Sequence, residues 1–475
     1  MIKQICAAAA LVSLSACAST PMVFRCPDLR TGGFEQKVPL SPYIEAIRRD
    51  ARPGDTIKIA SEETLFGGFR EADLQAFIAA NPEAFGVETG ADNTLVSDWK
   101  FTGDADPARV LALSGGGQWG AFGAGFFQQL DKEGKLPRFD HLTGVSTGAM
   151  QVLFLAAANT DDAKQREHNL AELVDAYTID KEKKIVHRGS QESALWRGSI
   201  AKLGPLRKLV EDKLCKSDKE CRLIEDLAKA KAPAFVGYVD AESGDLMQAD
   251  ITQIARHYAG RKDRLREGRD CLAGVAMASA AVPAFYQQIQ IESKRKDDNT
   301  LEKRTVFDGG VRQSVFFALH IEALRYVARL RNQQAKAMGL IDPEAMPDVD
   351  PRLYIVRNGP TIVDRKPESN KPRSVLGNGL HAYSLIVNQT EISSIETLHL
   401  LHSAGTPSYL VTADQVPVED GAEVDRYGAR LCTRSSDERE FMFLPRHMEC
   451  LRELGAKKAK EPWLTIPVPP KPPRQ

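Results

Sequence analysis

The chain has 475 residues, of which 43% are hydrophobic and 27% are charged. Such a composition provides a large buried core and excludes a predominantly disordered protein. The 63 basic and 64 acidic residues give a formal net charge of -1, whereas nucleic-acid-binding proteins usually carry a clustered basic excess. We therefore expect a folded protein with no nucleic-acid partner.

The N-terminal residues predict export. Lys3 gives a short basic start, residues 7–14 form an apolar run, and the letters LSAC at residues 14–17 place small residues before a cysteine, as in a secretory signal peptide. This tetrapeptide also resembles the lipobox of bacterial lipoproteins. That resemblance implies a signal peptide of residues 1–16 and lipidation of the Cys17 thiol. An ordinary secretory signal with a chance cysteine is the alternative.

The same resemblance implies a place in the bacterial cell envelope. Cys17 is followed by Ala18 and Ser19, without the aspartate that often retains lipoproteins at the inner membrane. The expected location is the outer membrane, with the protein facing the periplasm. No later apolar run approaches the ~20 residues that span a bilayer, so we expect a chain that is anchored to the membrane by its lipid.

Six cysteines remain after signal removal and lipidation: Cys26, Cys215, Cys221, Cys271, Cys432 and Cys450. An even number permits disulfides in an oxidising compartment. Cys215 lies close to Cys221, and Cys432 with Cys450 brackets one C-terminal segment, so these are the preferred pairs. The connectivity stays a hypothesis. Neither pair has the C-x-x-C spacing of common zinc sites, and we expect no metal.

The pattern of apolar and polar residues changes at Arg109. Residues 17–107 form a mixed segment that we interpret as an accessory region. Residues 110–113 are an apolar run before a glycine cluster, which predicts a buried parallel strand. Further strands are predicted near 139–143, 234–239 and 353–356, and helices near 120–130 and 149–158. Strands alternating with helices predict a three-layer α/β/α sandwich with a mainly parallel central sheet.

The first motif is SGGGQWG, residues 114–120, directly after the predicted strand. A strand that runs through glycines into a helix leaves backbone N–H groups directed outward, which suits an anion. The anion could be a phosphate, because the motif fits G-x-G-x-x-G, or the oxyanion of an attacked carbonyl. A tight turn without function is a third interpretation. The phosphate interpretation is weakened because Asp140 precedes the next apolar strand instead of ending it.

The second motif is GVSTG, residues 144–148, between a predicted strand and a predicted helix. The pattern G-x-S-x-G in this context is a nucleophile elbow, in which small flanking residues allow a strained turn that exposes the serine hydroxyl. The helix N-terminus then stabilises developing negative charge. Ser146 is therefore a candidate nucleophile.

The third motif is VFDGG, residues 306–310, where an apolar run brings Asp308 to a glycine turn. A carboxylate can remove the proton of a serine if burial raises its proton affinity and the two groups are close. Asp308 is therefore a candidate base. An ordinary Asp-Gly turn is the alternative.

The ordered set of these three motifs resembles the patatin-like phospholipase family over about residues 108–325. Residues 205–210 and 278–286 resemble the family more weakly. The resemblance implies a patatin-like fold and a Ser-Asp dyad in which Ser146 attacks a lipid ester and Asp308 acts as the base. It implies a phospholipase A or lysophospholipase that needs neither metal nor cofactor. The backbone amides of Gly115, Gly116 and Gly117 would form the oxyanion hole. The other motif glycines are Gly120, Gly144, Gly148, Gly309 and Gly310.

Two positions depart from the family pattern. Ser114 stands where many members have aspartate, and Trp119 stands where many have arginine or lysine. The loop therefore lacks a cation for a phospholipid headgroup. The resemblance divides the chain into a signal peptide (1–16), an N-terminal accessory region (17–107), a catalytic domain (108–325), a C-terminal α/β extension (326–463) and a proline-rich tail (464–475).

Two alternatives remain open. The first is an α/β-hydrolase-type esterase with a Ser-Asp-His triad, because that fold uses the same elbow. Its histidine would be one of those that follow Asp308, namely His320, His381, His399, His402 and His447. The second is a non-catalytic, membrane-anchored lipoprotein that uses the fold for interactions, because a fold does not guarantee an activity.

Overall fold

The structure is a computed structural model that describes most of the chain from Thr20 to Ile466. The described residues are 20–39, 65–66, 69–89, 95–97, 108–189, 199–339, 351–362, 375–401, 408–435, 438, 442–461 and 463–466. The predicted signal peptide and Cys17 lie outside them, as do residues 467–475 of the predicted tail.

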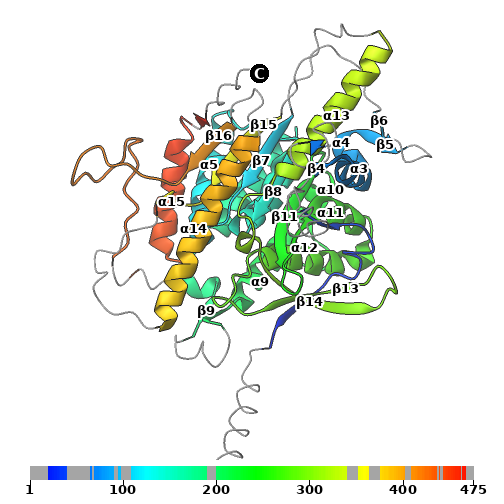
Figure 1. The fold of residues 1–475 in the computed structure, drawn as a ribbon. Helices are drawn as coiled ribbons and strands as arrows, with labels where there is room; N and C mark the ends of the chain where they lie inside the picture. Colours follow the sequence, from blue (N-terminus) through cyan, green and yellow to red (C-terminus); the bar gives the residue numbers. More distant parts are fainter. Residues whose placement is uncertain are drawn as a thin grey trace, which may run out of the picture.

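Eleven of the described strands form one mixed sheet (Figure 1). Its centre is parallel and consists, in spatial order, of β11 (Ala234–Asp240), β8 (His141–Val145), β7 (Arg109–Leu113), β15 (Arg352–Arg357) and β16 (Ser408–Thr412). Antiparallel strands extend this centre at both sides, namely β14 (Leu301–Asp308) and β13 (Ile289–Lys294) beyond β11, and β17 (Leu464–Ile466) beyond β16.

The N-terminal segment adds two strands to the same sheet. β1 (Met22–Arg25) runs parallel to β13 at the sheet edge. β2 (Glu35–Lys37) pairs with β12 (Leu246–Asp250), which itself pairs with β11. The N-terminal residues therefore contribute directly to the central sheet. The boundaries proposed between the regions of the chain stay predictions.

Helices cover both faces of the sheet, as β7 illustrates. Val110 and Ala112 pack in a core with residues of α13 (Ala318–Ala337) and α14 (Val375–Leu401). Leu111 and Leu113 pack in the opposite core, because successive side chains of a strand point to opposite faces. That core contains α5 (Gly120–Lys132), α6 (Thr147–Ala158), α12 (Leu265–Ser279) and α15 (Pro445–Lys458). The predicted three-layer α/β/α sandwich with a mainly parallel sheet is confirmed.

Shorter elements complete the described fold. The remaining helices are α3 (Glu71–Ala80), α4 (Pro82–Phe85), α7 (Ala163–Ala176), α9 (Gly204–Leu214), α10 (Arg222–Ala228) and α11 (Ile251–Ala259). The remaining strands form three hairpins, β3 (Leu65–Phe66) with β4 (Phe69–Arg70), β5 (Val87–Thr89) with β6 (Leu95–Ser97), and β9 (His187–Arg188) with β10 (Ala201–Lys202). None of the described helices combines the length and apolar character needed to cross a bilayer.

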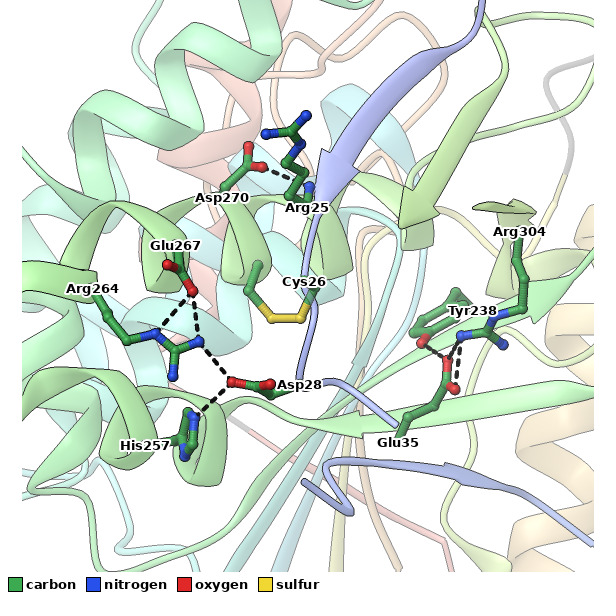
Figure 2. The surroundings of a disulfide bond; sticks show 11 residues. Arg25, Cys26, Asp28, Glu35, Tyr238, His257, Arg264, Glu267, Asp270 and Arg304 are labelled. Carbon is green, nitrogen blue, oxygen red and sulfur yellow. Dashed lines mark hydrogen bonds and ion pairs between the residues drawn. A yellow bond between two sulfur atoms is a disulfide. The ribbon is translucent and has the colours of Figure 1, made fainter. Parts of the chain in front are cut away.

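Three cysteine pairs lie at disulfide-bonding distance. Two of them are the pairs preferred from the sequence, Cys215–Cys221 and Cys432–Cys450. The third joins Cys26, just after β1, to Cys271 of α12. Figure 2 shows this third disulfide beside Asp28, which binds Arg264 at 2.7 Å and His257 at 3.1 Å. Covalent and ionic contacts thus hold the N-terminal segment against the domain.

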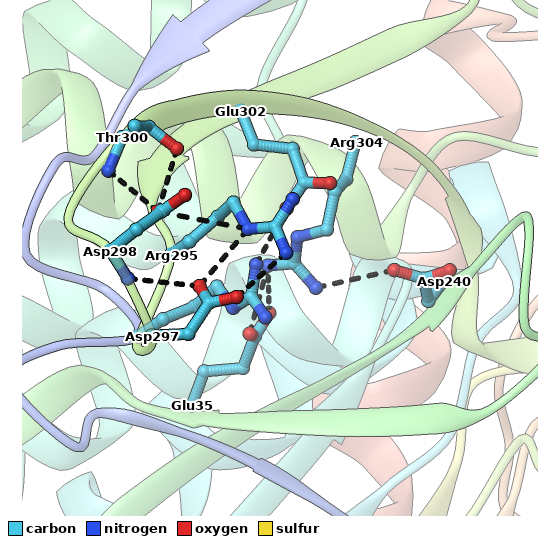
Figure 3. A network of polar contacts seen from close by, with 9 residues as sticks. Glu35, Asp240, Arg295, Asp297, Asp298, Thr300, Glu302 and Arg304 are labelled. Atoms are coloured by element: carbon cyan, nitrogen blue, oxygen red, sulfur yellow. Dashed lines mark hydrogen bonds and ion pairs between the residues drawn. The ribbon is translucent and has the colours of Figure 1, made fainter.

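A buried ionic cluster holds the end of this segment. The Arg304 guanidinium donates to both carboxylate oxygens of Glu35, at 2.7 and 2.8 Å, and to Asp240 at 3.2 Å (Figures 2 and 3). The Tyr238 hydroxyl donates to Glu35 as well. The side chain of Glu35 is only 2% exposed. Each partner therefore depends on the others, because a buried charge without its counter-ion is strongly destabilising.

We expect Glu35→Ala to lower the free energy of unfolding by about 3–5 kcal/mol. The substitution leaves the buried Arg304 with Asp240, at 3.2 Å, as its remaining counter-ion. Urea denaturation measures this change. The control is Asp297→Asn, which removes the partner of Arg295 in the exposed pair that Figure 3 shows in the foreground. Exposed pairs contribute little, so the control should match the wild type. Equal effects of the two substitutions would contradict the expectation.

Candidate active site

The sheet brings the three sequence motifs to one place. Val145, the last residue of β8, pairs with Gly237 of β11. The next residue of β11, Tyr238, pairs with Asp308, the last residue of β14. Ser146 follows Val145 directly, so β11 lies between the serine and the aspartate. The carboxyl ends of parallel strands are the usual position of sites in such sheets.

Ser146 lies on a strained turn at the start of α6. Its backbone has φ 55° and ψ -119°, a left-handed conformation that is uncommon for a residue with a side chain. A Cβ atom at Gly144 would lie 2.3 Å from the Gly148 carbonyl oxygen, and one at Gly148 would lie 2.5 Å from the Leu113 carbonyl oxygen. Both glycines are therefore required for the turn. The predicted elbow geometry is present around Ser146.

Ser279, the last residue of α12, is hydrogen bonded to the backbone of this turn. The Ser146 backbone N–H donates to the Ser279 hydroxyl at 2.8 Å, and that hydroxyl donates to the Gly237 carbonyl at 2.5 Å. Ser279 is fully buried. Ser279 was not predicted as a site residue, although it lies within the weaker family resemblance at residues 278–286. A polar residue at the end of an apolar helix is the signal that could have indicated it.

Asp308 lies against Ser146 in the buried interior. Its carboxylate accepts the Gly310 backbone N–H at 2.7 Å. Burial raises the pKa of Asp308 to about 7; the adjacent Ser146 hydroxyl and the Gly310 N–H oppose this rise, and the negative charge of Glu391 adds to it. Burial and proximity were the two conditions for a base, and the structure meets both.

The glycine loop passes beside the same serine. A Cβ atom at Gly115 would lie 3.3 Å from the Ser146 Cβ. Gly116 has φ 141°, and a Cβ there would lie 1.7 Å from the Asn358 carbonyl oxygen. Gly117 has φ 57° but faces open space. The loop backbone can approach the serine closely because these residues lack side chains.

The outer motif glycines allow close packing around this centre. A Cβ at Gly120 would lie 2.1 Å from the Thr147 hydroxyl oxygen, and one at Gly309 would lie 2.6 Å from the Gly237 carbonyl oxygen. At Gly310 a Cβ would lie 3.0 Å from the Asp308 carboxylate. The structure thus places every motif residue named from the sequence around one centre.

Residues 111–319 match the model of the patatin-like phospholipase family. These residues form a patatin-like phospholipase domain. The family resemblance inferred from the three motifs is therefore confirmed, and the family is one of lipid acyl hydrolases. The matched segment begins in β7 and ends in α13, so it contains the glycine loop, Ser146 and Asp308.

Comparison with other known proteins adds little to this match. A solved structure, the crystal structure of VipD from Legionella pneumophila, resembles the chain with a TM-score of 0.27 and 13% sequence identity. The likeness covers 80% of this chain and 70% of the VipD chain. A likeness at this level supports no argument about function. No curated protein matches the sequence significantly.

A buried polar network, which includes Asn358 from outside the matched segment, supports the glycine loop of the patatin-like domain. Asn358, which follows β15, donates through its side-chain amide to the Ser114 carbonyl at 3.0 Å and to Gln151 at 2.8 Å. Its backbone N–H donates to the Ser114 hydroxyl at 3.0 Å. Gln151 in turn donates to the Gly120 carbonyl at 2.8 Å. Both ends of the loop are thus bound to one buried network.

Asn358 and Gln151 were not predicted from the sequence as site residues. Gln151 is a buried polar residue in the otherwise apolar helix α6, and Asn358 ends an apolar strand. Isolated polar residues in apolar segments were the available signal, since buried polar groups need partners. Ser114, which replaces the aspartate of many family members, uses its hydroxyl as an acceptor in this network.

The described histidines make their contacts away from Ser146 and Asp308. His320 is hydrogen bonded to a glutamine, His399 to a serine, and His447 packs edge-on against an indole ring. In the part of the chain that the structure describes, no histidine is hydrogen bonded to Ser146 or Asp308. Two positions fall outside that part, the side chain of His381 and all of His402. Among the described residues, no cluster of three metal-binding side chains is present.

Proposed function

We propose that the chain is a serine acyl hydrolase of the phospholipase A or lysophospholipase type, in which Ser146 is the nucleophile and Asp308 the base. The observation that carries this proposal is that the Ser146 hydroxyl lies close enough to the buried Asp308 carboxylate to influence its pKa. A serine hydroxyl is a weak nucleophile until a neighbouring base accepts its proton. Asp308 is the neighbour with that capacity.

The reaction would proceed in two halves. Asp308 accepts the Ser146 proton while the serine oxygen attacks the ester carbonyl carbon. The carbonyl oxygen becomes negative and is stabilised by backbone N–H groups of Gly115, Gly116 and Gly117, and by the N-terminus of α6. The alcohol leaves with the proton from Asp308, and the acyl group stays on Ser146. Water then attacks the acyl carbon while Asp308 accepts a water proton. The bond to the Ser146 oxygen breaks, Asp308 returns the proton to that oxygen, and the fatty acid leaves.

Activity-based labelling tests the nucleophile. We expect a fluorophosphonate to label the wild type covalently and to leave Ser146→Ala unlabelled. The matched control is Ser293→Ala, a buried serine of β13, which should label like the wild type. Hydrolysis of defined phospholipids and lysophospholipids, with Ser146→Ala as blank, then identifies the ester bond that is cleaved. A folded wild type that resists labelling would favour the interaction scaffold instead.

The pH profile tests the base. The pKa of Asp308 lies at about 7, and the carboxylate must be ionised to accept the serine proton. We therefore expect kcat/KM for an ester to rise about tenfold per pH unit below this pKa and to level off above it. Initial rates over a pH series measure the profile. A plateau that extends down to about pH 5 would show that the base has an ordinary carboxylate pKa.

We further propose that the mature chain is anchored through lipid on Cys17 to the bacterial outer membrane and faces the periplasm. The lipobox-like residues 14–17 support the anchor. The three cysteine pairs at bonding distance support an oxidising compartment, because disulfides persist there. Mass spectrometry of Cys17 from membrane-extracted protein tests the lipid.

A further inference from the structure

The N-terminal segment enters the fold beside the proposed catalytic pair. Thr20 is the first described residue, and its carbonyl accepts the Gln287 side-chain amide at 2.5 Å. The Met22 backbone N–H donates to the Gln288 carbonyl at 2.8 Å, and β1 then continues along β13. The entry of the segment is thus held against residues 287–289.

A short turn connects this entry to the base. The Asp308 backbone N–H donates to the Ala281 carbonyl at 3.0 Å, and the Tyr286 N–H donates to the Val282 carbonyl at 3.0 Å. Tyr286 is close enough that the Asp308 charge raises its pKa, after the larger effect of burial. The turn of residues 281–286 therefore contacts Asp308 at its first residue and leads directly into Gln287 at its last.

The proposed lipid would lie near this turn. Cys17 precedes Thr20 by three residues, and three residues span at most about 11 Å when fully extended. The lipid anchor thus cannot be far from the entry point, whatever path the chain takes. Since the Cys26–Cys271 disulfide follows β1, the entry point also cannot move away from the domain.

Exposed basic residues lie on a hairpin that contacts the same turn. β10 bridges to it, because Ala201 pairs with Tyr286 and accepts the Gln287 N–H at 3.0 Å. β9 pairs with β10, and Figure 1 shows β9 and β1 at the same end of the molecule. We define the basic hairpin by its exposed residues Lys183, Lys184, His187, Arg188 and Lys202.

Among the described residues of 180–189 and 199–203, Asp180 and Glu182 are acidic, and each forms an ion pair with a residue of the basic hairpin. Asp180 pairs with Lys184 at 3.0 Å. Glu182 has a largely buried carboxylate that pairs with Arg188 at 3.7 Å and accepts the Met442 N–H at 2.6 Å. The hairpin's Lys183, Lys184, Arg188 and Lys202 outnumber these two acidic residues, so its described part carries a positive excess in a protein whose total charge is nearly zero. Such a surface is attracted to anionic lipid headgroups.

We propose that the basic hairpin rests on an anionic bilayer while the lipid on Cys17 holds the chain there, so that Ser146 is presented to the membrane surface. This proposal rests on the proposed function and the proposed lipidation. A lipid chain combined with a basic patch is an effective pair of membrane signals. Restricting the orientation of the enzyme then raises the effective concentration of bilayer esters at the site.

A fluorescent label on each of two surfaces tests the orientation independently of catalysis. Lys202→Cys labels the basic hairpin. Lys231→Cys labels an exposed position just before β11, at the sheet edge opposite Ser146. Full-length lipidated protein is placed on phosphatidylcholine vesicles containing phosphatidylglycerol. We expect an environment-sensitive dye to shift to the blue at position 202 and not at 231. Equal shifts, a shift at 231 alone, or failure of the wild type to stay on the vesicles would overturn the proposal.

Charge reversal tests the role of the basic hairpin. Lys183→Glu with Lys202→Glu should lower hydrolysis of vesicle phospholipid about tenfold, because the anionic surface now repels the hairpin. Hydrolysis of a soluble short-chain ester should not change. The matched control reverses Lys231 and Lys296, which are exposed away from this turn, and should behave like the wild type. An equal fall with both double variants, or with neither, would overturn the proposal.

The two experiments separate this proposal from the proposed function. A dye shift confined to position 202 without any Ser146-dependent hydrolysis would keep the orientation and reject the enzyme. Ser146-dependent hydrolysis with equal dye shifts would keep the enzyme and reject the orientation.

Discussion

Asp308→Asn is expected to lower ester hydrolysis by about 10³-fold or more, within the range that general bases contribute. Asparagine can still accept the Gly310 N–H and contact Ser146, but its neutral amide cannot accept a proton. Kinetics with a soluble ester measure the loss. A Ser-Asp-His triad would also lose activity in Asp308→Asn, so the result that contradicts the dyad is loss of activity in a variant of one of the histidines that follow Asp308, namely His320, His381, His399, His402 or His447.

The same substitution should stabilise the fold at high pH. The folded-state pKa of Asp308 is about 7, against an ordinary value of 3.8, so the folded protein binds this proton more tightly than the unfolded chain. Stability from this group is complete below the ordinary value and is lost as the pH rises toward about 7. Asparagine does not ionise, so the Asp308→Asn variant does not lose this stability as the pH rises.

Urea denaturation at about pH 5 and about pH 8 measures the effect, since the linkage predicts the larger gain at the higher pH. The variant should exceed the wild type by a few kcal/mol at the higher pH, at 1.36 kcal/mol per pKa unit. An equal difference at both values would show that the carboxylate is not perturbed. Loss of activity combined with a gain in stability would also exclude misfolding as the cause.

Gly116→Ala is expected to lower kcat by about 10²–10³-fold or more, the usual effect of losing an oxyanion-hole donor. The new Cβ would lie 1.7 Å from the Asn358 carbonyl oxygen, and the residue has φ 141°. A backbone atom cannot rotate away as a side chain can. The loop must therefore shift, and its N–H groups lose their alignment with the site.

The neighbouring glycine provides a matched control. Gly117 also has a positive φ, 57°, but a Cβ there meets no atom within 4 Å. Gly117→Ala should therefore retain far more activity, with a destabilisation of about 1–2 kcal/mol from the left-handed backbone. Kinetics and thermal denaturation of both variants measure the contrast. Equal losses would show that backbone strain, and not the contact with Asn358, limits the loop.

Local patterns located the elements of the site well. The predicted strand at 110–113 is β7, and the predicted helices near 120–130 and 149–158 are α5 and α6. The strand predicted near 139–143 lies instead at His141–Val145. Asp140 is not in the strand, because its carboxylate accepts the Arg109 N–H and caps the start of β7. Phe139 is apolar but packs outside the strand, so the apolar pattern predicted a strand start that is too early.

Residues that act through long-range contacts were not predicted. Ser279, Gln151 and Asn358 each bind a backbone group of the loop or the elbow. Their roles follow from partners that are distant in the sequence. The pairing of Cys26 with Cys271 was missed for the same reason, because no local spacing relates the two residues.

The sequence by itself determined the chemistry of the site, since a nucleophile elbow, a glycine loop and an Asp-Gly-Gly turn each need particular residues to satisfy a local backbone conformation. Only the tertiary structure decided that Ser146 and Asp308 meet, because strand order in the sheet sets the distance between two strand ends. It alone decided the proton affinity of Asp308, because burial is a property of the packed domain. It also placed the start of β1 beside the site, which no local pattern encodes.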